Sequence, residues 1–190
     1  KSAIIAGIFI IFSTTYGYGG NNDTGSSSNV VAAETQPTAS GQEQTLIIGP
    51  VTIDDDVVIQ SNTATIFEGT SINGNVIVLE GAQMFAEGAR IFGNVQAFGA
   101  ALVELKQGTF VDGDVQAEET LSVRVLDGTN VGGNVQIIDA PMDKDRLKVD
   151  NAWVDGDIQA ERSSGALVVT YTQIGGNLQF VENDTGPYEI

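Results

Sequence analysis

A nine-residue pattern recurs about every 20 residues along most of this 190-residue chain. Its clearest copy is GTNVGGNVQ at residues 128–136, and related copies lie at 69–77, 88–96, 108–116, 151–159 and 171–179. A degenerate first copy at 51–57 has Asp55 in place of the central glycine. A fixed period of this length predicts a solenoid, in which each repeat forms one coil and stacks on the next.

Apolar and polar residues alternate on both sides of the central glycine. In the clearest copy Val131 precedes the glycine, and Val135 and Ile137 follow it, while a second alternating run lies between copies. This period-two alternation indicates strands with one buried face, and residues 46–181 contain neither a 3.6-residue periodicity nor helix caps. The sequence therefore predicts an all-β fold, a single-stranded right-handed parallel β-helix (β-solenoid) of about seven ~20-residue coils, with the hand taken from strand twist.

The central glycines and the Asn or Asp after each of them are interpreted as a corner of the coil. Glycine adopts backbone angles that are closed to other residues, and Asn or Asp tolerates the left-handed region and bonds to nearby amides. The predicted corner residues are Gly74, Gly93, Gly113, Gly133, Gly156, Gly176, Asn75, Asn94, Asp114, Asn134, Asp157 and Asn177. Because most members of the Asn/Asp column are neutral, we expect a ladder that satisfies corner amides rather than a cation-binding edge.

A column of glutamines follows the corner on the outer face. Its members are Gln96, Gln116, Gln136, Gln159 and Gln179. In register, they are expected to form a side-chain amide ladder, or a flat uncharged strip that meets another chain or a glycan. Trp153, with Phe92, Phe110 and Arg90 near the same corner, adds exposed stacking surface.

The composition excludes several classes of function. The net charge of −17, from 25 acidic and 8 basic residues, repels nucleic acid, and there is no cysteine or histidine for a disulfide, a thiolate site or the commonest general base. Polysaccharide-cleaving β-helix enzymes need clustered carboxylates, usually under long loops. The coils here have almost no long loops between them, so we expect no enzyme, no catalytic residue, no metal site and no cofactor. Asp54–Asp56 is interpreted as part of the first coil, and the charged insert at 139–146 as a candidate binding loop.

The chain begins with a short apolar segment. Its large apolar residues are Ile4, Ile5, Ile8, Phe9, Ile10, Ile11 and Phe12. The run is too short to span a bilayer, and two interpretations stay open: a secretory signal, or a retained segment that drives assembly by entering a neighbouring subunit. The predicted organisation is therefore this segment at 1–20, a flexible low-complexity linker at 21–45, the β-solenoid at 46–181 and a C-terminal tail at 182–190.

The runs VGGNVQ, VDGDVQAE, VDGDIQAE and IGGNLQFVEN resemble exported bacterial β-helix proteins built from GGNVQ-type coils. More loosely, they resemble the bactofilins, polymer-forming cytoskeletal proteins whose small right-handed β-helix core stacks end to end. The resemblance covers about residues 50–181. Bactofilins are cytoplasmic and lack a segment like that at 3–12, so a polymer of this chain is expected outside the cytoplasm.

The open ends of a β-helix favour association, because unpaired strand edges recruit further strands. We therefore expect a structural, non-catalytic, extracellular or cell-surface subunit that self-assembles into a filament or surface layer, with itself as partner and no stable membrane span. The alternative is a monomeric cell-surface binding or adhesion module that recognises glycan or protein through the glutamine face or the loop at 139–146.

Overall fold

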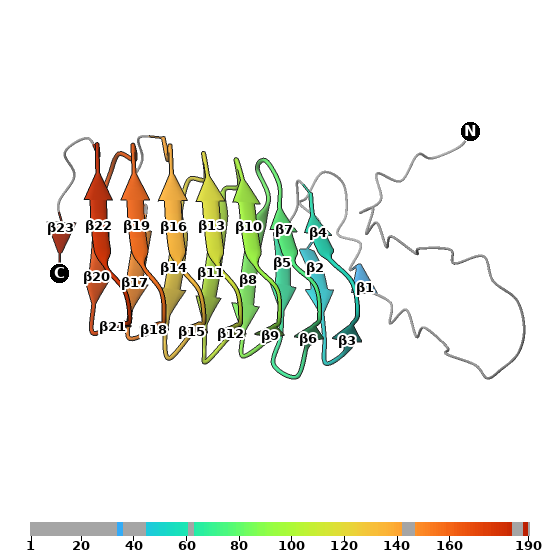
Figure 1. Ribbon diagram of the computed structural model, residues 1–190. Coiled ribbons are helices and arrows are strands. Elements are labelled where there is room, and N and C mark those ends of the chain that lie inside the picture. The colour runs from blue at the N-terminus through green and yellow to red at the C-terminus, as the bar shows by residue number, and fades with distance from the viewer. Residues whose placement is uncertain (1–33, 36–44, 61–62, 142–146, 184–187, 190) are drawn as a thin grey trace, which may run out of the picture.

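The computed structural model describes residues 34–35, 45–60, 63–141, 147–183 and 188–189. These residues form a β-solenoid with three parallel sheets, and within the described ranges every regular element is a strand (Figure 1). Sheets B and C each contain seven strands, in agreement with the expected number of coils. We number the coils 1 to 7 in chain order, from β2–β4 to β20–β22. The predicted all-β parallel solenoid with ~20-residue coils is thus confirmed.

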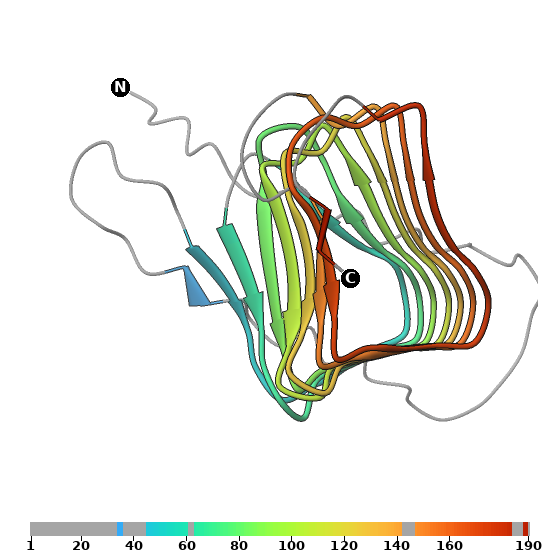
Figure 2. The ribbon, with the colours of Figure 1, turned by 90° about the vertical axis from the view of Figure 1, so that its left-hand side faces the viewer.

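The three sheets take one strand each from every coil. Sheet A consists of β1 (Glu34–Thr35), β2 (Thr45–Ile48), β5 (Thr63–Ile66), β8 (Gln83–Glu87), β11 (Leu102–Lys106), β14 (Val123–Leu126), β17 (Leu147–Asp150), β20 (Leu167–Thr170) and β23 (Tyr188–Glu189). Sheet B consists of β3 (Thr52–Ile53), β6 (Ser71–Ile72), β9 (Arg90–Ile91), β12 (Phe110–Val111), β15 (Asn130–Val131), β18 (Trp153–Val154) and β21 (Gln173–Ile174). Sheet C consists of β4 (Val57–Ile59), β7 (Val76–Val78), β10 (Val95–Phe98), β13 (Val115–Glu118), β16 (Val135–Ile138), β19 (Ile158–Glu161) and β22 (Leu178–Val181). Figure 2, which looks along the stack, shows the sheets as three sides around a common interior.

The core follows directly from the alternation in the sequence. In coils 2 to 6 the inward residues of sheets A, B and C, such as Val125, Val131 and Val135, are buried and belong to one continuous cluster. Strand pairs keep equivalent residues in register, as Val115 with Val135 and Val111 with Val131. A fully buried aliphatic side chain contributes about 1.5–3 kcal/mol relative to an exposed one, so this repeated column is the main source of stability.

The two ends of the solenoid differ. At the N-terminal end β1 pairs antiparallel with β2, although it lies in the segment interpreted as a linker, and at the C-terminal end β23 adds one strand to sheet A beside β20. Among the described residues, sheets B and C have no such extra strand at either end. In sheet C the inward Val57 and Ile59 of coil 1 are buried, whereas Leu178 and Phe180 of coil 7 are only half-buried. In sheet B the inward residues at the two ends, Ile53 and Ile174, are both half-buried. The interior beneath sheet C is therefore less covered at the C-terminal end.

The described residues include no helix of the length and apolarity needed to cross a membrane. The apolar segment with Ile4, Ile5, Ile8, Phe9, Ile10, Ile11 and Phe12 lies outside the described residues, as does the part of the insert at 142–146.

Candidate functional site

The predicted corner residues lie between sheets B and C and form a continuous hydrogen-bonded ladder. In each step the backbone N–H of an Asn or Asp donates to the side-chain Oδ1 of its counterpart one coil earlier. The six N···O distances lie between 2.6 and 2.9 Å, from Asn75 on Asp56 to Asn177 on Asp157. These side-chain oxygens satisfy the backbone amides at the corner, which do not pair within the sheets. The expected Asn/Asp ladder is thus confirmed.

The reason given for the central glycines is wrong. None of them has a positive φ, and they are required instead because successive coils approach closely at this corner. A Cβ on Gly93 would lie 2.5 Å from the carbonyl oxygen of Gly74 and 2.7 Å from Oδ1 of Asn75. The glycine therefore makes room for the ladder.

Positive φ angles occur instead at the other two corners of the coil. At the corner between sheets A and B they include Gly88 (φ 67°), Gly128 (φ 78°) and Asn151 (φ 51°). At the corner between sheets C and A, residues such as Asp139 (φ 52°) and Arg162 (φ 46°) take this conformation. Glycine and Asn or Asp tolerate it, whereas other side chains are strained. In the sequence, the first glycine of each repeat, such as Gly128, is the signal that marks the corner between sheets A and B.

Asp54–Asp56 terminates the ladder at coil 1. The carboxylate of Asp55 accepts the N–H of Asp56 at 2.9 Å, and that of Asp54 accepts from Nδ2 of Asn73 at 2.6 Å. No earlier coil in the described ranges offers an Oδ1 to the amide of Asp56, and Asp55 takes that role within its own coil. In the described ranges no three acidic residues cluster in a way that suits a metal ion.

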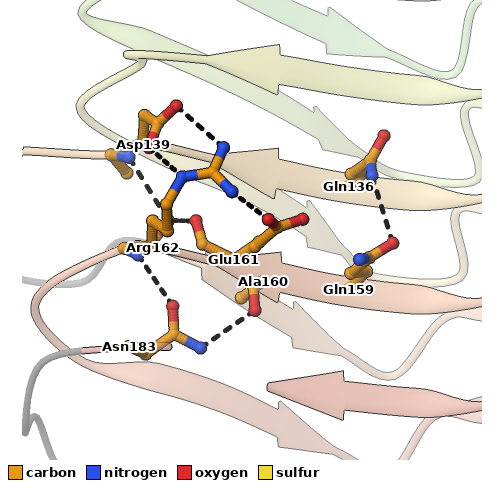
Figure 3. Close-up of polar contacts among 9 residues, drawn as sticks. Gln136, Asp139, Gln159, Ala160, Glu161, Arg162 and Asn183 are labelled. Atoms are coloured by element: carbon orange, nitrogen blue, oxygen red, sulfur yellow. Dashed lines mark hydrogen bonds and ion pairs between the residues drawn. The ribbon is translucent and has the colours of Figure 1, made fainter. Parts of the chain in front are cut away.

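The glutamine column lies in register on the outer face of sheet C, but its side chains form little of the ladder that was expected between neighbouring glutamines. Among the described residues one bond joins two members, from Nε2 of Gln136 to Oε1 of Gln159 at 3.1 Å (Figure 3). Nε2 of Gln116 instead lies 3.5 Å from Oδ2 of Asp114. The other amides are half-buried and uncharged, so the column presents a polar strip rather than a continuous ladder.

Beside the charged insert, Arg162 joins two coils. Its guanidinium donates to both carboxylate oxygens of Asp139, at 2.7 and 3.0 Å, and also contacts Glu161 (Figure 3). The hydrogen bonds from Arg162 lower the pKa of the Asp139 carboxyl, and the same bonds raise the pKa of Arg162. All three side chains are substantially exposed, so this pairing adds little to the stability of the fold. Its effect is to hold Asp139, at the base of the insert, against the next coil.

Trp153 lies on another face from the glutamines. It projects from β18 on the outside of sheet B, where register pairs place Arg90, Phe110, Asn130 and Trp153 in one column over coils 3 to 6. Phe92 lies at the adjacent corner, with its ring centroid 6.4 Å from that of Phe110 in an edge-to-face arrangement. The structure thus groups the aromatic residues with Arg90 and separates them from the glutamine strip.

The edge of coil 7 carries no charged residue between 172 and 181. The equivalent part of coil 6 has Asp155, Asp157 and Glu161. β21 and β22 are the terminal strands of sheets B and C. Edge strands are ordinarily protected against pairing by charges, which this edge lacks.

Comparisons with known proteins identify no relative: no protein-family model matches the chain, and neither the curated proteins nor the solved structures give a match. The fold itself is that of β-helix proteins in general.

Proposed function

We propose that this chain is a structural, non-catalytic subunit that self-assembles outside the cytoplasm into a filament or surface layer, with its C-terminal coil as a contact between copies. The observation that carries the proposal is the uncharged edge of coil 7, which no further described strand of sheets B and C covers. Ile174 and Leu178 are half-buried there, although their counterparts Val154 and Ile158 in coil 6 are buried. Covering these side chains would remove apolar surface from water, which favours association.

Two copies of the chain repel each other least when they meet at this edge. The chain has a net charge of −17, so most approaches between two copies bring acidic surfaces together. The segment 172–181 is free of charge, and contact between two such segments avoids that repulsion. A strand of one copy would pair beside β22 or β21 of the other and extend the sheet across the contact.

The N-terminal edge is unsuited to extending the stack in register. Each interior coil has glycine at its central corner position because a Cβ there meets the preceding coil, as Gly74 meets the carbonyl carbon of Asp55 at 2.6 Å. Coil 1 has Asp55 at this position, and its Cβ would meet the corner of a preceding coil in the same way. Head-to-tail continuation is therefore blocked, and we infer that two C-terminal ends meet.

Pairing of β22 with its copy would be antiparallel. Inward side chains must stay opposite inward ones, because a one-residue shift would turn the apolar set outward. Gln179 then lies directly or diagonally opposite Gln179 of the second copy.

Since β23 already extends sheet A at this end, the two solenoids would meet at an angle, open on the side of sheet A. Growth beyond the pair would need a second contact, for which the segment at 3–12 is the candidate if it is retained.

Export and the resemblance to GGNVQ-type exported proteins and to bactofilins belong to the same proposal. They rest on the apolar segment at 3–12 and on the repeat sequence.

The test uses the full chain, analysed by size-exclusion chromatography with light scattering over a range of concentrations. We expect a concentration-dependent dimer that Gln179→Lys converts to monomer, because two lysines face each other across the contact. Gln116→Lys is the matched control, since it occupies the same column in an interior strand that is paired on both sides. An equimolar mixture of Gln179→Lys and Gln179→Glu should restore association.

A wild-type chain that stays monomeric at every concentration would refute self-assembly through coil 7 and favour the monomeric binding module. Association that the lysine–glutamate mixture fails to restore would instead show that the tail-to-tail arrangement is wrong.

A further inference from the structure

The outer face of sheet B carries a line of aromatic and polar side chains that self-assembly does not use. We define this strip as Arg90, Phe92, Phe110, Asn130 and Trp153. Phe92 and Trp153 are 45% and 44% exposed, large fractions for aromatic side chains on a β-sheet. Exposed apolar groups that cluster in this way mark binding surfaces more often than isolated ones.

The strip is rigid and has a regular spacing. β12, β15 and β18 are each paired on both sides, so the backbone beneath the rings is fixed. Phe110 and Trp153 occupy the same column two coils apart, which corresponds to about 9.6 Å at the usual strand spacing. Their rings therefore form two steps of a platform that runs along the solenoid axis, with Asn130 between them.

The strip and the adjoining corner, which carries Gln107, hold polar groups with no partner among the described residues. The described lysines and arginines form ion pairs except Arg90, although the chain is strongly acidic. The side chains of Gln107, Asn130 and Trp153 likewise make no hydrogen bond to another described residue. The guanidinium, the two amides and the indole N–H are thus available as donors toward a ligand.

A groove of about 680 Å³ runs beside the platform at the corner of sheets A and B. Arg90, Phe110 and Asn130 line it, and Glu68, Ser71 and Gln107 supply further polar groups. Gly69, Gly88 and Gly108 at this corner also line the groove. The groove and the rings together form a long, shallow surface with aromatic and hydrogen-bonding groups side by side.

We propose that this strip binds an extended, β-linked polysaccharide that lies along the solenoid axis. The negatively charged face of an aromatic ring attracts the polarised C–H bonds of a sugar ring. The hydroxyl groups of the sugar accept hydrogen bonds from the free donors and donate to Glu68 and the amide oxygens. A linear polymer of identical units matches a platform whose coils repeat at constant spacing.

The charge of the surface argues against the other extended polymers. Nucleic acid is repelled by the acidic chain. A basic peptide would meet the like charge of Arg90 at the end of the column. A neutral polysaccharide has neither conflict. Because the strip lies on a different face from the edge of coil 7, this proposal goes beyond self-assembly and holds for a monomer as well.

Trp153 makes the test direct, because it is the only tryptophan of the chain. Its fluorescence is followed while cellohexaose or chitohexaose is added to the full protein. We expect a saturable change in emission with at least one hexasaccharide, and binding at least tenfold weaker for the corresponding disaccharide, whose two sugar rings cannot reach both Phe110 and Trp153. Retention on insoluble cellulose or chitin should follow the same preference.

Phe110→Ala removes one ring of the platform without removing the reporter, and we expect it to weaken binding at least tenfold. Phe98→Ala is the matched control: Phe98 is 46% exposed but lies on sheet C, so binding should not change. Arg90→Gln should weaken binding while circular dichroism stays unchanged.

Three results would overturn the proposal. They are the absence of any fluorescence change or retention with both polysaccharides, equal effects of Phe110→Ala and Phe98→Ala, or a saturable change produced by a lysine-rich peptide but by neither hexasaccharide.

Discussion

Replacement of Gly93 by alanine tests whether close approach between coils, rather than backbone conformation, fixes the corner glycines. The added Cβ would lie 2.5 Å from the carbonyl oxygen of Gly74 and 2.7 Å from Oδ1 of Asn75. The carbonyl belongs to a paired backbone that cannot move alone, so coils 2 and 3 must separate locally. This separation weakens the ladder bond from Asn94 N–H to Asn75 Oδ1, now 2.9 Å, and the bond from Gly93 N–H to Gly74 O, now 3.1 Å.

The expected cost adds two contributions. The partly buried ladder bond, when weakened, costs up to about 1 kcal/mol, and the strain of an overpacked methyl group costs about 1–3 kcal/mol. We therefore expect Gly93→Ala to lower the free energy of unfolding by about 3 kcal/mol, which corresponds to roughly 10 °C in Tm for a chain of this size. Thermal unfolding followed by circular dichroism measures both.

Two further glycines separate the possible causes. Gly128 has a φ of 78° but nothing within 4 Å of its added Cβ, so Gly128→Ala carries backbone strain alone, about 1–2 kcal/mol. Gly49 has neither a positive φ nor a neighbour within 4 Å, so Gly49→Ala should be neutral or slightly stabilising. If Gly93→Ala melts with Gly49→Ala, or above Gly128→Ala, the close-approach explanation is refuted.

Two other predictions concern the remaining corners. Tyr171 has a φ of 49° and is 90% exposed, so Tyr171→Gly should raise the free energy of unfolding by about 1 kcal/mol, whereas Asn151→Gly at the same corner should change it little; an unchanged Tm for both would contradict this. The pKa of Asp139 is lowered by Arg162, so the stability from this pair is present above the unfolded pKa of Asp and is lost as the pH falls through the lower folded value. Asp139→Asn should therefore flatten the acid side of a plot of Tm against pH, and a slope equal to that of wild type would show that the pair contributes nothing.

The sequence predicted the parts of this fold that repeat. The spacing of the central glycines predicted the coil, the alternation around Val131 and Val135 predicted the inward columns, and the Asn/Asp column predicted the ladder. Each of these features recurs in all or nearly all of the seven coils, and this repetition distinguishes it from a chance pattern. The apolar pattern also determines the register, because a one-residue shift would turn the core outward.

The parts that occur once could not be predicted in the same way. The capping of Asp56 by Asp55 occurs at the first described coil, where no preceding Oδ1 is described, and a local pattern does not reveal it. The isolation of Arg90 depends on which side chains from other coils lie within reach. The cause assigned to the central glycines was wrong because a sequence shows that a Cβ is excluded, but not whether φ or a neighbouring carbonyl excludes it. Arg162 and Tyr171 take positive φ values that their residue types do not suggest.

The ladder between sheets B and C has a direction. In every step the N–H belongs to the later coil and the accepting Oδ1 to the earlier one, as with Asn94 on Asn75. A chain that emerges from the ribosome or crosses a membrane N-terminus first therefore presents a finished acceptor before the next donor arrives. Coil 1 needs no such template, because Asp55 completes it from within. Folding can proceed vectorially, one coil at a time, so a defect at Gly74 deprives five later coils of their template, whereas the same defect at Gly176 deprives none.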